Sequence, residues 1–273
     1  MVARIVGIAL VRNEDRFVEQ AIRNVARFCD VIHVVDHVSD DRTWEIVRTL
    51  ASEFDHVDAR RSRNSAVAHR LLEQYAGTPT WVLGVDGDEL YDPSGLARLR
   101  VELRRGVLAD VFRVKAHVLN CDELNRRSGV AAGWFAPPSR PVTKLFNFGA
   151  VKSWTGSPDP LQSGDIGFET GFSWESRRNL ADETDWESDP LRLLHVCFLR
   201  RSSRESDDGI VRSNLDESRA YDRSPVGTIK RALRRPRRSP QLDELQRRGR
   251  SWKHEWYARG ERAAVDATPF FDV

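Results

Sequence analysis

The sequence predicts an α/β protein in which helices flank a mixed sheet, with a small helical extension at the C-terminal end. Over the first hundred residues, short apolar runs rich in β-branched residues alternate with amphipathic stretches, as in βαβ units around a parallel sheet. Polar residues follow the ends of these runs, where open α/β sheets bind ligands. The length of 273 residues, with 40% hydrophobic and 31% charged residues, suits one globular domain with an appendage.

The elements of the first half follow from the hydrophobic spacing. Between residues 15 and 28 the apolar residues recur every three or four positions, which places them on one face of a helix. Residues 81–85 form an apolar run, as expected of a strand buried on both faces. In chain order, we expect strands at 4–12, 31–35, 56–60 (at an edge of the sheet) and 81–85, alternating with helices at 15–28, 41–54, 65–76 and 93–105.

The second hundred residues show a different pattern. We expect strands at 110–119 and 142–148, separated by a loop that contains Gly and Pro, and therefore a sheet of mixed strand order. Residues 153–190 are rich in Gly, Ser, Asp, Glu and Trp and are expected to be irregular. A strand at 193–199 closes the region, so we place a first domain at residues 1–200.

Residues 201–273 are expected to form a polar, helical extension with a linker at 235–240. Within it, residues 230–250 hold nine Lys or Arg residues against Asp243 and Glu244, a local charge of +7 in a chain of net charge +2. We interpret this stretch as a solvated basic segment, with contact to an anion or a membrane surface as the alternative. Nucleic acid is not an expected partner, because no aromatic-interleaved binding module accompanies the arginines.

The composition also bears on the compartment. No stretch approaches the roughly 20 apolar residues of a membrane-spanning helix, which excludes a processive synthase that threads a polymer through its own channel. The first ten residues, interrupted by Arg4, lack the length and cleavage site of a signal peptide. Cys29, Cys121 and Cys197 lie far apart without metal-ligand spacing and suit a reducing compartment. We expect a cytoplasmic protein, with peripheral contact at the inner face of the membrane through residues 230–250 as an option. Arginine outnumbers lysine 38 to 5, which hints at a GC-rich genome such as a bacterium's.

An acidic turn follows the apolar run at 81–85. It consists of Asp86, Gly87, Asp88 and Glu89. Carboxylates this close repel one another, and a divalent cation that prefers oxygen ligands relieves the repulsion. Such a cation also neutralises the diphosphate that leaves when a sugar nucleotide reacts. An isolated Asp-Gly-Asp would equally suit an exposed turn, so the interpretation depends on the rest of the sequence.

Two other strand ends carry polar residues. Arg12, Asn13 and Glu14 follow the first expected strand. Asp36 follows the second, where it can accept hydrogen bonds from a base or a ribose. The Ser, Asp and Thr residues of 39–43 would cap the next helix, but capping does not account for Asp36 after an otherwise apolar strand.

With these groups in place, the chain resembles the family 2 glycosyltransferases. That family shows a strand followed by RNE, a strand ending in D-x-x-S-x-D-x-T, a helix with A-R-N, and W-hydrophobic-D-x-D-E. The counterparts here are Arg12 to Glu14, Asp36 to Thr43, Ala68 to Arg70 and Trp81 to Glu89, in matching order and spacing over residues 4–92. The four motifs together are specific for this family, although each motif alone would be weak evidence for it. The resemblance implies a GT-A fold, which is Rossmann-like, and metal-dependent transfer of a sugar from a nucleotide-diphosphate sugar to an acceptor hydroxyl.

The resemblance also implies roles for single residues in donor binding. Arg12, Asn13 and Glu14 would line the pocket of the base. Asp36 would contact the nucleoside. Arg70 would contact the diphosphate, for which a guanidinium is a natural partner, with a helix-surface salt bridge as the alternative.

The implied metal is Mn²⁺ or Mg²⁺. Asp86 would contact the ribose or the metal, and Asp88 the metal. Enzymes of this fold often supply a histidine to the metal from a late strand, and His195 is the candidate here. A histidine packed in an apolar strand for structural reasons is the alternative.

The catalytic base is the remaining assignment. An inverting transferase needs a carboxylate to take the proton of the acceptor hydroxyl. Relatives often carry Trp, a short gap and HE near the acceptor, and Trp154–Pro160 departs from this, with Asp159 at the histidine position. We choose Asp159 as the base and Glu169 as its first rival, with Asp165 and Glu175 as further rivals. The acceptor (a glycan, a lipid-linked molecule or a small molecule) and the oligomeric state are left open.

Two other functions are compatible with the acidic turn. In a haloacid-dehalogenase-like phosphatase, an apolar strand also ends in two aspartates, and Asp86 would be the nucleophile. Against this, three strand–helix units precede the turn, and Glu89 replaces the expected small hydroxyl or β-branched residue. The departure from HE at Asp159 favours instead a catalytically silent protein of GT-A fold that acts as a binding partner or scaffold.

Overall fold

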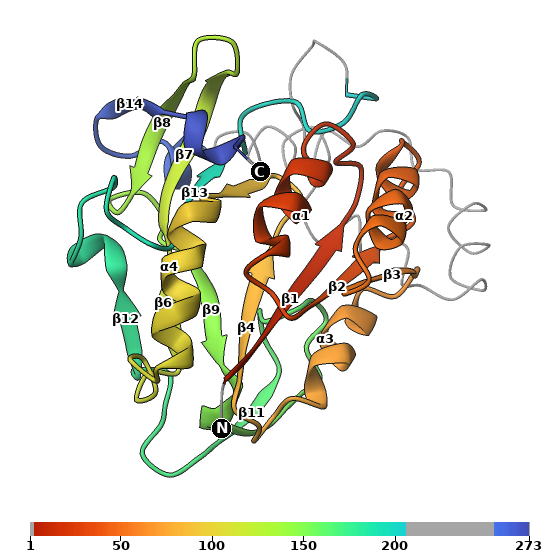
Figure 1. Ribbon diagram of the computed structural model, residues 1–273, viewed down its shortest axis with the longest axis vertical. Coiled ribbons are helices and arrows are strands. Elements are labelled where there is room, and N and C mark those ends of the chain that lie inside the picture. The colour runs from red at the N-terminus through yellow and green to blue at the C-terminus, as the bar shows by residue number, and fades with distance from the viewer. Residues whose placement is uncertain (1–2, 206–253, 273) are drawn as a thin grey trace, which may run out of the picture.

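The computed structural model describes residues 3–205 and 254–272, which form two large sheets and a two-stranded one, with helices packed on the largest (Figure 1). The strands of the larger sheet are β1 (Arg4–Val11), β2 (Val31–Asp36), β3 (Val57–Arg61), β4 (Thr80–Val85), β6 (Arg113–Lys115), β9 (Thr143–Asn147) and β12 (Arg177–Asn179). Their order is β12-β6-β9-β4-β1-β2-β3. β1 pairs in parallel with β2 and β4, and β2 with β3, whereas β9 runs antiparallel to β4 and β6. The sheet is therefore mixed.

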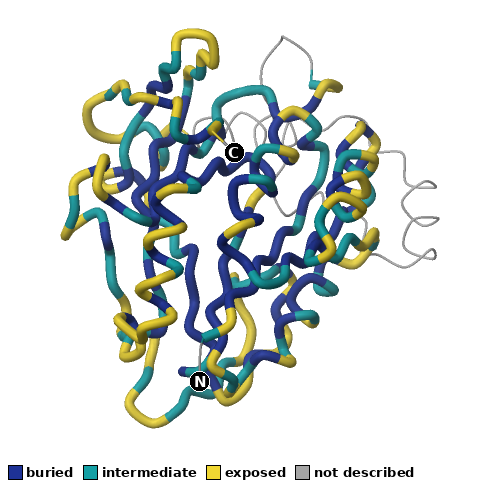
Figure 2. Tube along the Cα trace, in the orientation of Figure 1, coloured by how far each residue is buried: buried dark blue, intermediate teal, exposed yellow. Residues whose placement is uncertain are grey.

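Four helices cover the two faces of this sheet. They are α1 (Val18–Ala26), α2 (Thr43–Glu53), α3 (Ala66–Glu73) and α4 (Pro93–Arg104). Because side chains alternate along a strand, Ile5 and Ala9 join one apolar cluster with α1, α2 and α4, while Val6 and Ile8 join another with α3. Figure 2 shows the central strands buried and the outer faces of the helices exposed.

The second sheet lies beside the first, at the top of Figure 1. Its strands are β5 (Glu89–Tyr91), β7 (His117–Asn125), β8 (Val130–Ala136), β13 (Arg192–His195) and β14 (Arg262–Asp266), in the order β14-β8-β7-β13-β5. β5 follows β4 after only three residues, so the turn at 86–88 joins the two sheets. β13 pairs in parallel with β7 and antiparallel with β5.

Smaller elements complete the fold. They are the hairpin of β10 (Val151–Thr155) and β11 (Asp165–Phe168), and the 3₁₀ helices η1 (Phe148–Ala150), η2 (Leu180–Asp182) and η3 (Thr268–Phe270). Trp154 of β10 is fully buried and packs against Phe112, Phe146 and Phe148 beneath the larger sheet. This aromatic cluster fixes the hairpin, and with it the loop between its strands.

The predicted fold class is confirmed, because the larger sheet is mixed and flanked by helices. The strand–helix order of the first half is also as predicted, with ends that differ by a few residues. The expected strand at 110–119 is in fact β6 and β7, which belong to different sheets. The region 153–190, expected to be irregular, contains β11, β12 and part of β10. The expected strand at 193–199 ends at His195.

The C-terminal part of the chain differs from a purely helical extension. Residues 254–257 are helical, but Arg262–Asp266 form β14, which extends the second sheet by pairing with β8. Residues 206–253, with the predicted linker and the basic stretch at 230–250, lie outside the described residues. The domain boundary at residue 200 stays a prediction.

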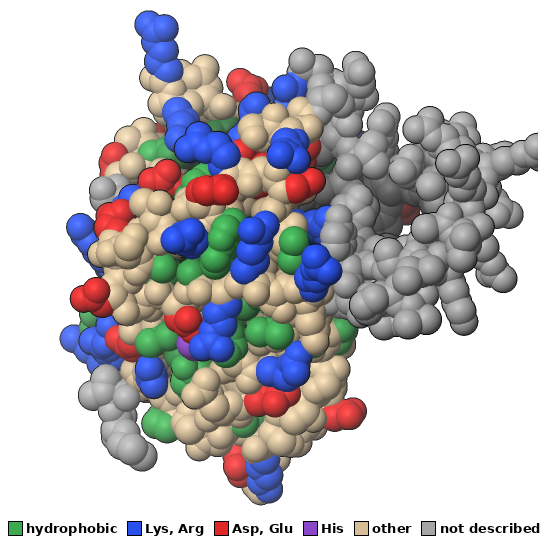
Figure 3. Space-filling model, turned by 90° about the vertical axis from the view of Figure 1, so that its right-hand side faces the viewer, with side chains coloured by type: hydrophobic (Ala, Val, Ile, Leu, Met, Phe, Trp, Pro, Cys, Tyr) green, Lys and Arg blue, Asp and Glu red, His purple; other side chains and the backbone are tan. Residues whose placement is uncertain are grey.

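One edge of the larger sheet is protected by charge. β3 ends in Arg60 and Arg61, and charged side chains on an edge strand discourage pairing with another chain. The side of the molecule at which β3 lies faces the viewer in Figure 3, where its described surface mixes basic and acidic side chains with small hydrophobic patches. Within the residues that the structure describes, none of the helices has the length and apolar character needed to cross a membrane.

Candidate active site

A cavity of about 950 Å³ opens at the carboxyl ends of β1, β2 and β4. β2 and β3 lie on one side of β1 and β4 lies on the other, so the strand order reverses between β1 and β4. Ligands of open α/β sheets bind at such a reversal. The charged and polar residues that line the cavity include Arg12, Asn13, Glu14, His37, Asp40, Asp86, Asp88, Glu89, Lys144, Asp159, His195, Arg201 and Tyr257.

The loop after β2 holds the loop after β1 in place. Ser39 Oγ accepts a hydrogen bond from the Asn13 amide at 3.0 Å, and Thr43 Oγ1 accepts one from the Glu14 amide at 2.8 Å. The Asp40 amide donates to Asn13 Oδ1 at 3.0 Å. Asn13 has a φ of 53°, a left-handed conformation that Asn adopts more readily than most residues. The hydroxyls of Ser39 and Thr43 therefore position the loop after β1. The residue at the N-cap of α2, Arg42, makes no capping hydrogen bond with its side chain.

Gly87 is required because Glu14 fills the space beside it. A Cβ built on Gly87 would lie 2.0 Å from Glu14 Oε2 and 3.2 Å from Glu14 Cβ. The backbone of the turn therefore packs directly against the carboxylate of Glu14, which is itself buried. In this way the acidic turn of β4 gains a further carboxylate from the loop after β1.

Asp88 is buried and pairs with the guanidinium of Arg201, which lies near the end of the described range 3–205. Arg201 Nη1 donates a hydrogen bond to Asp88 Oδ2 and lies 3.7 Å from Glu14 Oε1. His195 Nε2 lies 3.6 Å from the same oxygen of Asp88. His195 Nδ1 lies 2.9 Å from Asn120 Oδ1, its register partner on β7. Because an amide oxygen only accepts, Nδ1 carries the proton in this pair.

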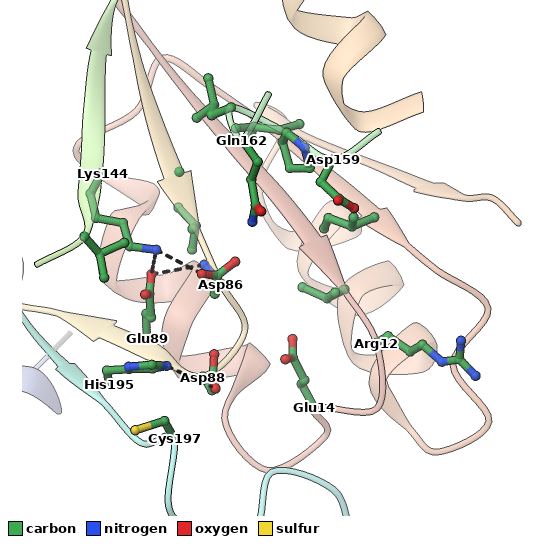
Figure 4. Close-up of a pocket in the computed structure, with 18 of the residues that line it drawn as sticks. Arg12, Glu14, Asp86, Asp88, Glu89, Lys144, Asp159, Gln162, His195 and Cys197 are labelled. Carbon is green, nitrogen blue, oxygen red and sulfur yellow. Dashed lines mark hydrogen bonds and ion pairs between the residues drawn. The ribbon is translucent and has the colours of Figure 1, made fainter. Parts of the chain in front are cut away.

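A second cation bridges the other two carboxylates of the turn. Lys144 Nζ lies 2.6 Å from Glu89 Oε2 and 2.9 Å from Asp86 Oδ2, as the dashed lines of Figure 4 show. Lys144 and Glu89 are buried, whereas the Asp86 side chain is 56% exposed. Lys144 is on β9, where Leu145 faces the opposite side of the sheet.

These contacts shift the protonation of the buried groups. Burial raises the pKa of Glu89 to about 7, although Lys144 opposes the shift. Burial and the nearby Asp88 raise the pKa of Glu14 well above its usual value. Burial alone would raise the pKa of Asp88, but Arg201 and His195 hold it far below its usual range. Asp88 is therefore the carboxylate of the turn that is most firmly ionised.

Two predicted donor-binding residues do not line the cavity. Asp36 is buried, and its carboxylate accepts from the Ser39 amide at 3.1 Å and pairs with Arg61 Nε at 3.0 Å. Asp36 thus braces the loop that in turn holds Asn13. Arg70 is exposed on α3, with its Nε 3.5 Å from the carbonyl of Ala66. Their contacts to a nucleotide stay predictions.

The two candidate bases differ in position. Asp159 is buried in the loop between β10 and β11 and lines the cavity. Ser65 Oγ, just before α3, anchors this loop by donating to the carbonyl of Pro158 at 2.6 Å. Glu169 follows β11 outside the lining, 42% exposed and 3.9 Å from Lys152 Nζ. Position therefore favours Asp159 over Glu169 as a group that meets a ligand.

The predicted metal ligands supply atoms that suit Mn²⁺ or Mg²⁺, but their arrangement does not fit a metal ion. Asp86 is paired with Lys144, and Asp88 with Arg201 and His195. Within the described part of the chain, no group of three or more His, Cys, Asp or Glu side chains is placed to hold a metal. The metal role of Asp86, Asp88 and His195 stays a prediction from the sequence.

The lining residues that sequence reasoning missed include Lys144, Arg201 and Tyr257. Lys144 carries a usable signal, because it is one of only five lysines and stands in an apolar strand. Arg201 gives no such signal among 38 arginines. Tyr257 reaches the cavity from beyond residue 253, and its ring centroid lies 5.4 Å from that of His195.

The fold and the cavity together define an α/β protein with a polar ligand site at the carboxyl edge of its parallel strands. No family model and no curated protein matches the chain. Among solved structures, the chain is similar to the mannosyltransferase PcManGT from Pyrobaculum calidifontis in complex with GDP-Man and Mn²⁺, at 21% identity and a TM-score of 0.33. That match covers 45% of this chain and 36% of the mannosyltransferase, so it spans little more than a third of that protein's length.

A second similar structure is the mannose-6-phosphate isomerase from Helicobacter pylori, at 13% identity and a TM-score of 0.32. The match covers 54% of this chain and 71% of the isomerase. Both TM-scores are too low to carry an argument about the activity of this chain, so its function has to be inferred from the site itself.

Proposed function

We propose that the protein is a glycosyltransferase that moves a sugar from a nucleotide-diphosphate sugar to an acceptor hydroxyl. One observation carries the proposal. The cavity at the reversal of strand order brings the Arg12–Glu14 loop, the acidic turn at 86–89 and the Asp159 loop to one place. The first two are among the four segments on which the resemblance to family 2 glycosyltransferases rests, and they follow different strands. Their convergence on a ligand-sized cavity is what a donor site requires.

In this proposal the nucleoside lies on the loops after β1 and β2. Arg12 and Asn13 line the cavity beside Asp40, and together they offer a base both donors and acceptors. Asp86, with its exposed carboxylate, is placed to accept a hydrogen bond from a ribose hydroxyl. Asp36 contributes by bracing the loop through Ser39.

Transfer with inversion needs one carboxylate on the acceptor side. The acceptor oxygen forms a bond to the anomeric carbon while the bond from that carbon to the phosphate oxygen breaks. The proton of the acceptor hydroxyl passes to Asp159, and the nucleoside diphosphate leaves with the electron pair. Asp159 suits this role because it lines the cavity from a loop that is separate from the acidic turn (Figure 4).

The donor class is tested by thermal shift with a panel of nucleotide-diphosphate sugars, followed by assays of donor hydrolysis. Binding of a donor to the folded protein raises the melting temperature, by an amount that grows with the logarithm of the ratio of donor concentration to dissociation constant. A shift by one nucleoside series with slow release of its sugar would support the proposal. Hydrolysis of simple phosphoesters without any such shift would instead indicate a phosphatase, and donor binding without turnover would indicate a silent binding protein.

The base is tested by Asp159→Asn, with Glu169→Gln as the matched control. Loss of general-base assistance typically slows a reaction by about 10²- to 10⁴-fold, so transfer should fall on that order while donor affinity stays within a few-fold. Glu169→Gln should leave transfer nearly unchanged, because that side chain lies outside the cavity. Rates are measured with the donor found above, and the product of the wild type is checked for inversion by NMR. A large loss in Glu169→Gln alone would move the role to Glu169.

A further inference from the structure

The acidic turn is neutralised by cations of the protein itself. Arg201 lies between Glu14 and Asp88, and Lys144 between Asp86 and Glu89 (Figure 4 shows the Lys144 pairs). We propose that Arg201, together with Lys144, receives the diphosphate of the donor, so that donor binding at this site does not require a divalent cation. The inference rests on the proposed function and concerns how the same site meets its ligand.

Arg201 carries the argument because it is buried with unused donors. Its side chain is 3% exposed, and Nη1 alone serves Asp88 and Glu14. Within the described residues, Arg201 Nε and Nη2 are buried without a hydrogen-bond partner. Buried polar groups in proteins nearly always have partners, and Arg201 is one of the residues that line the cavity, so its two unsatisfied nitrogens point to acceptors that a ligand supplies. The fork of N–H groups on a guanidinium matches the oxygens of a phosphate.

The segment that carries Arg201 is fixed in the fold. The carbonyl of Arg201 accepts from the Arg16 amide at 3.1 Å, and the Arg201 amide donates to Glu205 Oε2 at 2.9 Å. The next residue, Ser202, donates from Oγ to Asp41 Oδ2 at 2.6 Å. A metal ion at Asp88 would have to displace a guanidinium that is held from both its backbone and its neighbours.

Charge balance leads to the same result. A divalent cation at such a turn has two tasks, to relieve the repulsion between carboxylates and to offset the diphosphate. Arg201 and Lys144 together bring the same charge of two, and each already bridges two carboxylates. The resident cations therefore perform the first task, and the unused N–H groups of Arg201 are placed for the second.

The first experiment uses the wild-type protein alone. Binding of ADP, CDP, GDP, UDP and pyrophosphate is measured by calorimetry in EDTA and in Mn²⁺, and binding of Mn²⁺ by electron paramagnetic resonance. We expect the nucleoside diphosphate that binds to have dissociation constants within about 3-fold in the two buffers, a difference in binding free energy of about 0.65 kcal/mol. We also expect no stoichiometric Mn²⁺ site.

The second experiment compares two methionine variants. Arg201→Met should weaken binding in EDTA by at least about 10-fold, because charge-assisted hydrogen bonds to phosphate are lost. The matched control is Arg192→Met, which also removes a buried arginine, one that pairs with Asp92 at 2.9 Å and does not line the cavity. That variant should keep its affinity within about 3-fold of the wild type. Arg201→Lys, which retains the charge, should recover part of the loss and replaces Arg201→Met if the latter does not fold.

The outcomes separate this inference from the proposed function. Binding that needs Mn²⁺, with one Mn²⁺ bound by the wild type and lost in Asp88→Asn, would overturn the inference and leave the glycosyltransferase proposal standing. Equal losses in Arg201→Met and Arg192→Met would also overturn it, because the loss would then be structural. The absence of binding of any nucleoside diphosphate in either buffer would overturn both.

Discussion

At the scale of single residues, the site depends on opposite charges that come from distant parts of the chain. Arg201 is 113 positions from Asp88, yet the two form the most buried ion pair of the cavity. Removing one partner of a buried pair is typically destabilising by about 3–5 kcal/mol, because the other charge is left without compensation. Such pairs therefore bind the loop after β1, the acidic turn and the segment at 201–205 into one unit.

Gly87 allows a sharp test of this unit. Gly87→Ala would place a methyl group 2.0 Å from Glu14 Oε2, so either the turn or the glutamate has to move. We expect a loss of about 1–3 kcal/mol in the free energy of unfolding, as for other overpacked sites, and weaker donor binding. Urea denaturation measures the first and calorimetry the second.

The control for this substitution is Gly84 of β4, which lies just before the turn. A Cβ on Gly84 would meet its nearest neighbours, Leu161 Cδ1 and the carbonyl of Lys144, at 3.4 and 3.7 Å, which are ordinary contacts. Gly84→Ala should therefore change the free energy of unfolding by less than about 1 kcal/mol. If both variants were equally stable, Glu14 would not pack as described.

The sequence predicts some of these residues and not others for a physical reason. Arg12 and Asp88 follow apolar strands, and parallel strands bring their carboxyl ends to one edge, so their convergence could be expected. Asp159, chosen from the sequence as the base, lines the same cavity, and its role stays a prediction. Arg201 and Lys144 could not be paired with their carboxylates, because the spacing along the chain carries no information about contacts between distant segments.

At the scale of elements, Asp30 connects three of them. It precedes β2, its Oδ2 accepts from the Ile5 amide of β1 at 2.8 Å, and its Oδ1 pairs with Arg100 and Arg104 of α4. Burial alone would raise the pKa of Asp30, but these hydrogen bonds and the two arginines lower it below 3.8. The group is about one quarter exposed, so solvent weakens the effect.

The lowered pKa predicts how the stability of the protein varies with pH. A carboxyl group with a lower pKa in the folded state stabilises the fold above its unfolded pKa and loses that contribution as the pH falls through the folded pKa. Asp30→Asn should therefore lower the free energy of unfolding by about 1–2 kcal/mol at pH 7, and by progressively less below a pH of 3.8. Urea titrations of both proteins at pH 7 and pH 3 measure the difference. A difference that grows on acidification would contradict the assignment.

The strands that the sequence did not predict either carry a weak local signal, as β8 does, or pair with a distant partner, as β14 does. Along β8, Ala131, Ala132 and Gly133 weaken the local strand signal, and Val130 is its one β-branched residue. Gly133 is needed because a Cβ there would lie 2.0 Å from the carbonyl of Asn120 on β7. By contrast, the units of the first half were predicted because the helix and strand periods are local. β14 pairs with β8 across more than a hundred residues of sequence, which no local pattern indicates.

At the scale of the whole molecule, the described parts of the chain on either side of residues 206–253 both return to the cavity. Arg201 enters it from one side of this gap, and Tyr257 from the other. Ser139 Oγ fixes the second part by donating to the carbonyl of Tyr257 at 3.0 Å. Further on, Phe270 is buried, and its ring stacks on Trp186 with centroids 5.9 Å apart. The C-terminal residues 254–272 are thus anchored to the rest of the described fold.

This arrangement predicts a division of roles along the chain. A variant in which the nine Lys and Arg residues of 230–250 become Gln keeps the chain length and removes the local charge of +7. It should retain donor binding within about 3-fold, because both Arg201 and Tyr257 keep their anchors. Its binding to vesicles of phosphatidylglycerol and phosphatidylcholine should fall at least about 10-fold, because each basic residue near an anionic surface contributes about 1 kcal/mol.

The dependence of both affinities on NaCl concentration shows whether the basic residues act through their charge. Wild-type binding to the vesicles should weaken from 50 to 500 mM NaCl, since the Debye length shortens from about 14 Å to about 4 Å, while donor binding in the enclosed cavity should change less. Vesicle co-sedimentation and calorimetry measure the two affinities. If donor binding were lost in a folded Gln variant, the basic stretch would act on the donor site. If vesicle binding were equally weak in the wild type, the stretch would be a solvated segment, the other interpretation of its charge.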